Sequence, residues 1–137
     1  MKLCSACLLG IKCRYDGKNK ANKKIIKLSG KEILIPACPE QIGGLPTPRE
    51  ASEQRGDRVI TESGRDVTRN FKKGAKEILR LAKLLGVTEA ILKQKSPSCG
   101  CGKIPDGSFS GRTIKGDGVT TALLKKNGIK VLTEDDF

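Results

Sequence analysis

The sequence predicts an α/β domain with three layers, in which helices cover both faces of a mostly parallel sheet. Strand-like apolar runs alternate with helical patterns along the chain, as they do in folds with a parallel sheet. Residues 32–36 also contain a continuous apolar run, which is typical of a strand buried on both faces. The chain has 137 residues, enough for a closed core, so we expect residues 1–137 to form a single domain.

The first half of the chain is expected to begin with a strand at residues 1–5. Residues 8–17 then form a loop that ends in an Asp-Gly turn. Residues 22–28 form one or two helical turns, which a Ser-Gly pair stops. The second strand follows at residues 32–36.

The segment after the second strand is predicted to be a shaped loop. Residues 39–56 are rich in proline and contain a Gly-Gly pair, which favours irregular backbone. Residues 58–61 are expected to form a short edge strand or the arm of a hairpin. The long loop is therefore expected to cover the site rather than to belong to the sheet.

The most regular pattern predicts a long helix that Asp66 or Thr68 caps and Gly86 ends. Apolar residues recur at helical spacing along it, which defines a buried face. This face consists of Phe71, Ala75, Ile78, Leu79, Ala82 and Leu85.

The last third of the chain repeats the strand-helix alternation. A strand is expected at residues 88–94, followed by a glycine-rich stretch at residues 106–112. A helix at residues 119–126 ends at an Asn-Gly pair, and residues 129–132 form the last strand.

The charge balance favours an anionic partner without identifying it. The formal net charge is +12, from 27 basic and 15 acidic residues, which is compatible with binding to nucleic acid. Stacking aromatics are scarce, with three Phe, one Tyr and no Trp, so a solvated surface is favoured over an RNA-binding stripe. Attraction for RNA or for an anionic substrate stays open.

Cysteines dominate the chemistry that this chain offers. Three strand-like runs lead into cysteine-bearing loops, at residues 2–7, 33–40 and 90–101, and the chain has no histidine. Parallel strands end at the same edge of a sheet, where open α/β sheets bind ligands. Three thiolates that meet there indicate a soft-metal centre with one open position, which points to an iron–sulfur cluster used for chemistry.

Two other uses of the six cysteines are less favoured. Disulfides suit small secreted proteins, but no export signal and no membrane-spanning run is visible, so we expect a cytoplasmic protein without a membrane partner. Structural zinc usually takes two spaced pairs. Cys4 and Cys7 form one such pair, but Cys99 and Cys101 are too close for the usual second half.

Several motifs in the same order resemble the thiouracil desulfidase family, long filed as a domain of unknown function. The resemblance spans the whole chain. The matching motifs are Ser5-Ala6-Cys7-Leu8-Leu9-Gly10, Arg14-Tyr15-Asp16-Gly17, Cys38-Pro39-Glu40, Gly43-Gly44-Leu45, Pro48-Arg49, Asp66-Val67-Thr68, Ser96-Pro97-Ser98-Cys99-Gly100, Phe109-Ser110-Gly111 and Gly116-Asp117-Gly118-Val119-Thr120. The chain departs from the family pattern at residues 104–107, where an aromatic residue is expected before the Asp, and at Thr121.

The resemblance implies a Rossmann-like domain that binds a [4Fe-4S] cluster through three cysteines and leaves one iron free for the substrate's sulfur. At the matching positions the ligands are Cys7, Cys38 and Cys99. The remaining cysteines, Cys4, Cys13 and Cys101, would be accessory or incidental. The implied substrate is a small thiobase such as 2-thiouracil, which loses its sulfur as sulfide without any electron being moved.

Such a reaction needs a proton carrier, and without histidine the task falls to carboxylates and hydroxyls. Glu40 follows Cys38 by two residues, and Asp16 lies in the first cysteine loop; Ser98 precedes Cys99. Each has a plainer interpretation: Glu40 as a helix cap or ion-pair partner, Asp16 as a turn former, and Ser98 as a turn former. Residues 116–118 could hold an anion at a helix start or simply cap the helix.

Three function classes therefore follow from the sequence. A non-redox desulfidase requires a cluster with an open iron. A cluster- or zinc-containing protein for RNA binding or tRNA sulfur modification would show steeply salt-dependent RNA binding. An electron carrier would use a fourth cysteine ligand.

Overall fold

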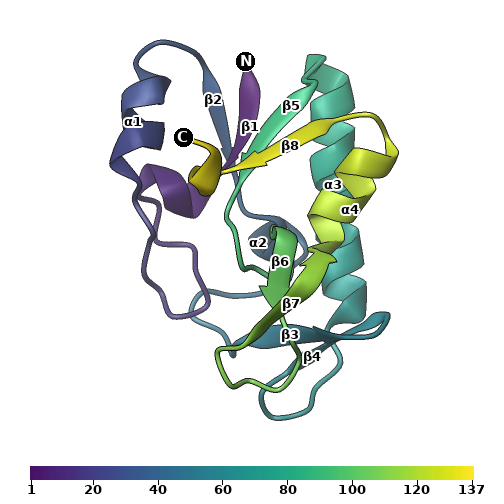
Figure 1. The fold of residues 1–137 in the computed structure, drawn as a ribbon. Coiled ribbons are helices and arrows are strands. Elements are labelled where there is room, and N and C mark those ends of the chain that lie inside the picture. Colours follow the sequence, from purple (N-terminus) through teal and green to yellow (C-terminus); the bar gives the residue numbers. More distant parts are fainter.

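A four-stranded parallel sheet forms the centre of the computed structural model, which describes all residues from 1 to 137. Its strands are β1 (Lys2–Ser5), β2 (Leu34–Ala37), β5 (Glu89–Leu92) and β8 (Lys130–Thr133). They lie in the order β2-β1-β5-β8, and all three pairings are parallel (Figure 1). The predicted α/β class is confirmed.

Helices cover both faces of this sheet. Helix α1 (Lys23–Ser29) and the 3₁₀ turn η1 (Ala6–Leu9) lie on one side, and α3 (Thr68–Leu85) and α4 (Val119–Lys126) lie on the other (Figure 1). Neighbouring strand residues pack in opposite directions, since Leu3 joins the core beneath α3 whereas Cys4 packs with Ile25 of α1. Successive strand side chains point to opposite faces, so the sheet needs both layers.

The second strand is an edge strand, and the expectation that it is fully buried on both faces is wrong, because only Ala37 of its four residues is buried. Ile33 is 67% exposed, and Pro36 is exposed as well. Proline has no N–H to donate to a neighbouring strand, so it is tolerated at the edge of a sheet. Half-buried Leu34 and Ile35 contact the cores on opposite faces of the sheet, so the apolar run reflects partial burial on both faces.

Helix α3 begins at Thr68 and ends before Gly86, as predicted, although its N-cap residue is Val67 and the carboxylate that meets its first N–H comes from Asp66, one residue earlier. The Asp66 carboxylate accepts the Thr68 N–H at 2.9 Å, and Gly86 ends the helix with a φ of 68°, a conformation that favours glycine. The predicted face is buried except that Leu79 is half-buried and Leu85 is 40% exposed. Val87, beyond the Gly86 turn, joins the core instead of Leu85.

One segment predicted as a loop contains regular structure, and a second hairpin appears beside the glycine-rich stretch. Residues 39–56 hold the short helix α2 (Pro39–Ile42) and β3 (Ser52–Arg55), which pairs with β4 (Arg58–Thr61) in an antiparallel hairpin. The glycine-rich stretch at residues 106–112 is the loop of a second hairpin, whose strands β6 (Cys101–Pro105) and β7 (Thr113–Asp117) were not predicted. Both hairpins lie below the carboxyl ends of the parallel strands (Figure 1).

The chain ends in a short 3₁₀ turn, η2 (Glu134–Asp136), which Thr133 caps. The Glu134 carboxylate accepts the Gln94 N–H at 2.6 Å and pairs with Lys93 at 2.8 Å. The end of the chain is thereby tied to the loop after β5. None of the helices has the length and hydropathy to cross a membrane.

Candidate metal centre and active site

The loops after β1, β2 and β5 open onto one cavity of about 380 Å³, and each contributes a cysteine to its wall. These are Cys7, Cys38 and Cys99, the three that the family resemblance indicates. The chain leaves β1 toward η1 and α1 on one face of the sheet, whereas after β5 it passes through the β6–β7 hairpin to α4 on the other face (Figure 1). Ligands of open α/β sheets bind at such a divergence, so the cavity lies where the topology predicts a site.

Cys38 is placed by an unusually close contact between α2 and α3. A Cβ added at Gly74 of α3 would lie 2.0 Å from the carbonyl oxygen of Pro39, and one added at Gly43 would lie 2.1 Å from that of Asn70. Only glycine at both positions allows the two helices to pack backbone against backbone. The contact between the two helices thus fixes the start of α2, where Cys38 and Glu40 lie.

Cys99 lies in a tight turn that docks on the start of α4. The N–H groups of Val119 and Thr120 donate to the carbonyls of Pro97 and Ser98 at 3.0 and 2.9 Å. The first turn of α4 therefore binds the cysteine loop itself, and the interpretation of this helix start as an anion site is wrong. Gly118 allows the approach, since its Cβ would lie 2.3 Å from the Ser98 carbonyl.

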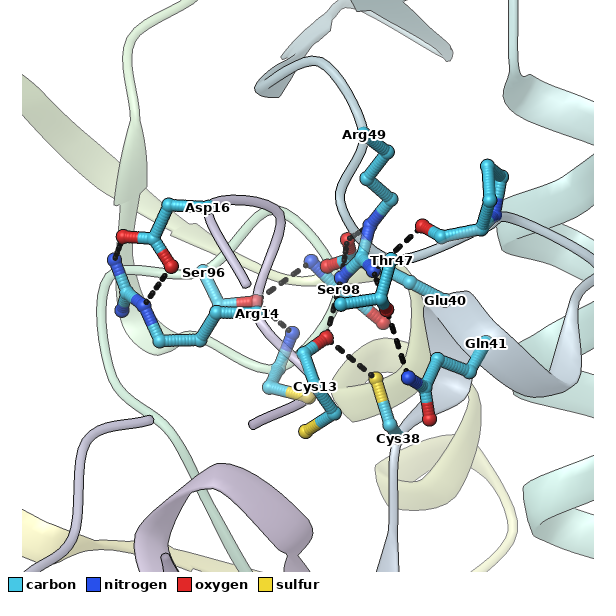
Figure 2. A network of polar contacts seen from close by, with 12 residues as sticks. Cys13, Arg14, Asp16, Cys38, Glu40, Gln41, Thr47, Arg49, Ser96 and Ser98 are labelled. Atoms are coloured by element: carbon cyan, nitrogen blue, oxygen red, sulfur yellow. Dashed lines mark hydrogen bonds and ion pairs between the residues drawn. The ribbon is translucent and has the colours of Figure 1, made fainter. Parts of the chain in front are cut away.

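A fourth cysteine, Cys13, lines the same cavity, although the sequence motifs set it aside. Its carbonyl accepts a weak hydrogen bond from the Cys38 thiol at 3.7 Å and a strong one from Arg49 at 3.0 Å. Figure 2 shows Cys13 and Cys38 side by side with Arg49 above them. Three loops far apart in sequence are thus connected around the sulfur atoms.

Cys38 and Cys99 are poor acids in the protein alone. The Cys13 side chain and burial raise the pKa of Cys38, and burial raises the pKa of Cys99 to about 12. Metals bind thiolates, so binding of a metal centre releases protons from these cysteines, and its affinity increases as the pH rises.

Glu40 lies in the cavity wall within a tight ion pair. The Arg49 Nε and Nη2 atoms lie 2.9 and 2.8 Å from Glu40 Oε2 (Figure 2). The Arg49 side chain is only 7% exposed and also donates to the carbonyls of Cys13 and Pro46. The ion-pair interpretation of Glu40 is confirmed, yet its second carboxylate oxygen forms no bond within the protein and is available to a ligand.

The other two predicted catalytic residues do not line the cavity. Asp16 accepts the Lys18 N–H at 2.9 Å and pairs with Arg14 at 3.3 Å, so it acts as a turn former (Figure 2). Ser98 is fully buried, and its hydroxyl contacts that of Thr120 at 2.9 Å. Both residues hold their loops in place.

Sequence reasoning missed several residues of the cavity wall. They include a buried carboxylate and three cationic side chains, namely Glu53, Lys20, Lys93 and Lys95. No local motif marks them, because they come from two sheet-edge loops and a hairpin that meet only in the folded chain. The one backbone signal is the positive φ of 60° at Lys95, which is uncommon for a residue other than glycine.

The donor set fits an iron–sulfur cluster. Cysteine thiols from three separate loops line one cavity, all six cysteines are free, and the chain has no histidine. No three His, Cys, Asp or Glu side chains are grouped closely enough to hold a single metal ion. Ligands spread around a larger space suit a centre of several irons better than one zinc ion.

Comparison with known families decides the classification. The model of the 2-thiouracil desulfurase family matches residues 3–136. The chain belongs to this family. Its sequence is 44% identical to that of the uncharacterised protein YbbK of Bacillus subtilis strain 168, over 100% of this chain and 97% of that protein.

A solved structure of the family shares the fold. The [4Fe-4S]-dependent thiouracil desulfidase TudS superposes with a TM-score of 0.94 at 46% sequence identity, over 99% of this chain and 91% of that one. The resemblance seen in the sequence and the Rossmann-like fold class that it implied are both confirmed.

Proposed function

We infer that the chain is a [4Fe-4S]-dependent desulfidase that acts on a thiolated nucleobase such as 2-thiouracil. The observation that carries this conclusion is the meeting of Cys7, Cys38 and Cys99 in the wall of one cavity. Family membership and the likeness to a [4Fe-4S]-dependent thiouracil desulfidase support it. In the overall reaction the thiocarbonyl and water give a carbonyl and hydrogen sulfide, so no electron is gained or lost.

Cys7, Cys38 and Cys99 would hold the cluster. When bound through three thiolates, such a cluster supplies an iron without a protein ligand, a Lewis acid that prefers sulfur to oxygen. Lys20 and Lys95 line the same cavity, form no ion pair and offset the negative charge of the thiolates. Arg14 and Lys93 line it too, but they are paired with Asp16 and Glu134. We therefore assign part of the net charge of +12 to the site itself.

Glu40 is the group proposed to move the proton. Arg49 holds Oε2 at 2.8 and 2.9 Å, which leaves Oε1 to accept a proton from the attacking water. The same oxygen then delivers the proton to the departing sulfur. Positioned acid–base groups of this kind contribute roughly 10²–10⁴-fold in rate.

Ser96 is proposed to donate a hydrogen bond to the bound base. It lines the cavity, and its hydroxyl oxygen accepts the N–H groups of Ser98 and Cys99 at 3.2 and 3.0 Å. With its lone pairs used in this way, the hydroxyl hydrogen is free to point to an acceptor on the ligand. This assignment replaces the role that the sequence suggested for Ser98.

The test is anaerobic reconstitution with ⁵⁷Fe, followed by Mössbauer spectroscopy with and without 2-thiouracil. We expect one iron to change its signal on addition of the thiobase, and sulfide to form without added reductant. A cluster in which all four irons stay alike, or turnover that strictly needs an electron donor, would refute the assignment. Four like irons would instead favour an electron carrier.

A further inference from the structure

Glu53 of β3 is a buried carboxylate that the proposed reaction does not use. It is 9% exposed and belongs to the cavity wall. Unlike Glu40, it forms no ion pair with any lysine or arginine. Buried charges are normally paired, because burial of an unpaired charge costs stability. An exception in the wall of a site suggests a role toward a ligand.

Only one of its two oxygens is used within the protein. Oε1 accepts the backbone N–H groups of Gly107 and Phe109 at 2.9 and 3.0 Å. Oε2 has no hydrogen-bond partner within the protein. Every fully buried polar side-chain atom of the structure has such a partner, so Oε2 is not one of the fully buried atoms. Oε2 is therefore reached by solvent, and the cavity provides that space.

The surroundings of Glu53 hold it in place. The neighbouring Gln54 side chain donates to the carbonyls of Pro97 and Asp117 at 2.9 and 3.0 Å, which ties β3 to the Cys99 loop. Arg55 donates to the Gly107 carbonyl at 2.8 Å and lies over the Phe109 ring. Groups fixed in this way before binding lose little entropy when a ligand arrives.

We propose that Glu53 selects the substrate by accepting a hydrogen bond from a ring N–H of the thiobase through Oε2. The proposal rests on the proposed function. A carboxylate accepts hydrogen bonds and cannot donate them, so its ligand must present a donor. A thiolated pyrimidine base carries N–H groups directly beside the thiocarbonyl carbon.

The test compares ligands with and without ring N–H groups on the reconstituted enzyme. Dissociation constants are measured by calorimetry for uracil and 1,3-dimethyluracil, and kcat/KM for 2-thiouracil and 1,3-dimethyl-2-thiouracil. The variants are Glu53→Gln and the matched control Glu50→Gln. Glu50 is exposed, lies outside the cavity wall and binds only Ser63.

The wild type is expected to prefer the N–H compounds by about 10- to 100-fold, the range of a hydrogen bond to a charged group. In Glu53→Gln the amide oxygen can still serve Gly107 and Phe109, while the NH₂ group faces the ligand as a second donor. The preference should fall below about threefold there and stay at the wild-type value in Glu50→Gln. An unchanged preference in Glu53→Gln, or none in the wild type, would overturn the proposal.

Two further controls keep the outcome unambiguous. If Glu53→Gln does not fold, Glu53→Asp is measured in the same way; its shorter carboxylate should lose part of the preference, and an unchanged preference again overturns the proposal. Absence of sulfide release by the wild type would refute the proposed function alone. The binding of uracil against dimethyluracil would still decide the role of Glu53.

Discussion

The loops at the carboxyl ends of the parallel strands, called the sheet edge below, and the two hairpins face the same cavity. Different contacts hold the two regions in place. At the sheet edge, backbone meets backbone: Gly74 lies against Pro39, and Gly118 lies against Ser98. Side chains join the hairpins β3–β4 and β6–β7 to each other and to the site: Glu53 binds the 107–109 turn, and Gln54 binds the Pro97 carbonyl of the Cys99 loop. The cysteine side is thus intolerant of added volume. The hairpin side has a close backbone approach as well, at Gly107 beside the Gln54 carbonyl, but the groups that it presents to the cavity are side chains that can change.

This contrast separates two tasks. A cluster needs its ligands in one fixed arrangement, which contacts between backbones supply. Selection of a substrate needs donors and acceptors that match the ligand, and the hairpins supply these as side chains. Changes at the sheet edge should therefore affect the cluster, and changes at the hairpins should affect substrate choice with the cluster retained.

The largest effect is expected from the three cysteines of the sheet edge. Cys7→Ser, Cys38→Ser and Cys99→Ser should each abolish stable cluster binding, because a three-thiolate site has no ligand to spare. Iron and sulfide content after anaerobic reconstitution, with the visible absorbance, measures this. Cys13→Ser and Glu53→Gln should retain the cluster. Loss of the cluster in Cys13→Ser would make Cys13 a ligand and would break the assignment.

Glu40→Gln should leave the cluster intact and slow the reaction. The amide can still accept from Arg49 but cannot carry the proton, so kcat should fall by roughly 10²–10⁴-fold. Sulfide release under anaerobic turnover gives the rate, and absorbance confirms the cluster. Turnover near the wild-type value would show that Glu40 only anchors Arg49.

Gly74→Ala tests the rigidity of the sheet edge. Its Cβ would lie 2.0 Å from the Pro39 carbonyl, and such overpacking costs about 1–3 kcal/mol, more than the roughly 1 kcal/mol that alanine gains in helix propensity. Thermal unfolding should show a net loss of stability, accompanied by weaker cluster retention. Gly30→Ala is the control, since its Cβ makes only an ordinary contact at 3.4 Å. Equal stability of the two variants would contradict the close approach.

The smallest effect is expected at Cys4, which lies within the sheet and should react slowly with thiol reagents. Burial raises the pKa of Cys4 from 9.0 to about 12, so its thiolate fraction at pH 8 is lower by about a thousandfold. Because the thiolate is the reactive form, iodoacetamide should modify half-exposed Cys101 well before Cys4. The modification of Cys4 should rise with pH up to about pH 12. Mass spectrometry of the native protein measures both sites, and fast modification of Cys4 at pH 8 would disprove its burial.

Much of the site could be predicted because its signals are local. The loop motifs that contain Cys7, Cys38 and Cys99 each follow a strand-like run, and the alternation of strands and helices places those loops at one edge. Helix α3 could also be predicted from the sequence, since its apolar spacing and the glycine that ends it lie within a single segment. The predicted burial was wrong where it depends on tertiary position, as at Ile33 beside the edge strand and at Leu85 at the end of α3.

The sequence by itself determined the fold class, the family and the three cysteines that face the cavity, because periodicity and motifs are properties of neighbouring residues. Only the tertiary structure decided that Cys13 joins the cavity, that Ser98 and Asp16 serve their own loops, and that Glu53 lines the wall. Glu53 meets its partners Gly107 and Phe109 across 54 and 56 residues. Contacts of that kind form only when distant segments pack together, so they cannot be predicted from a local sequence pattern.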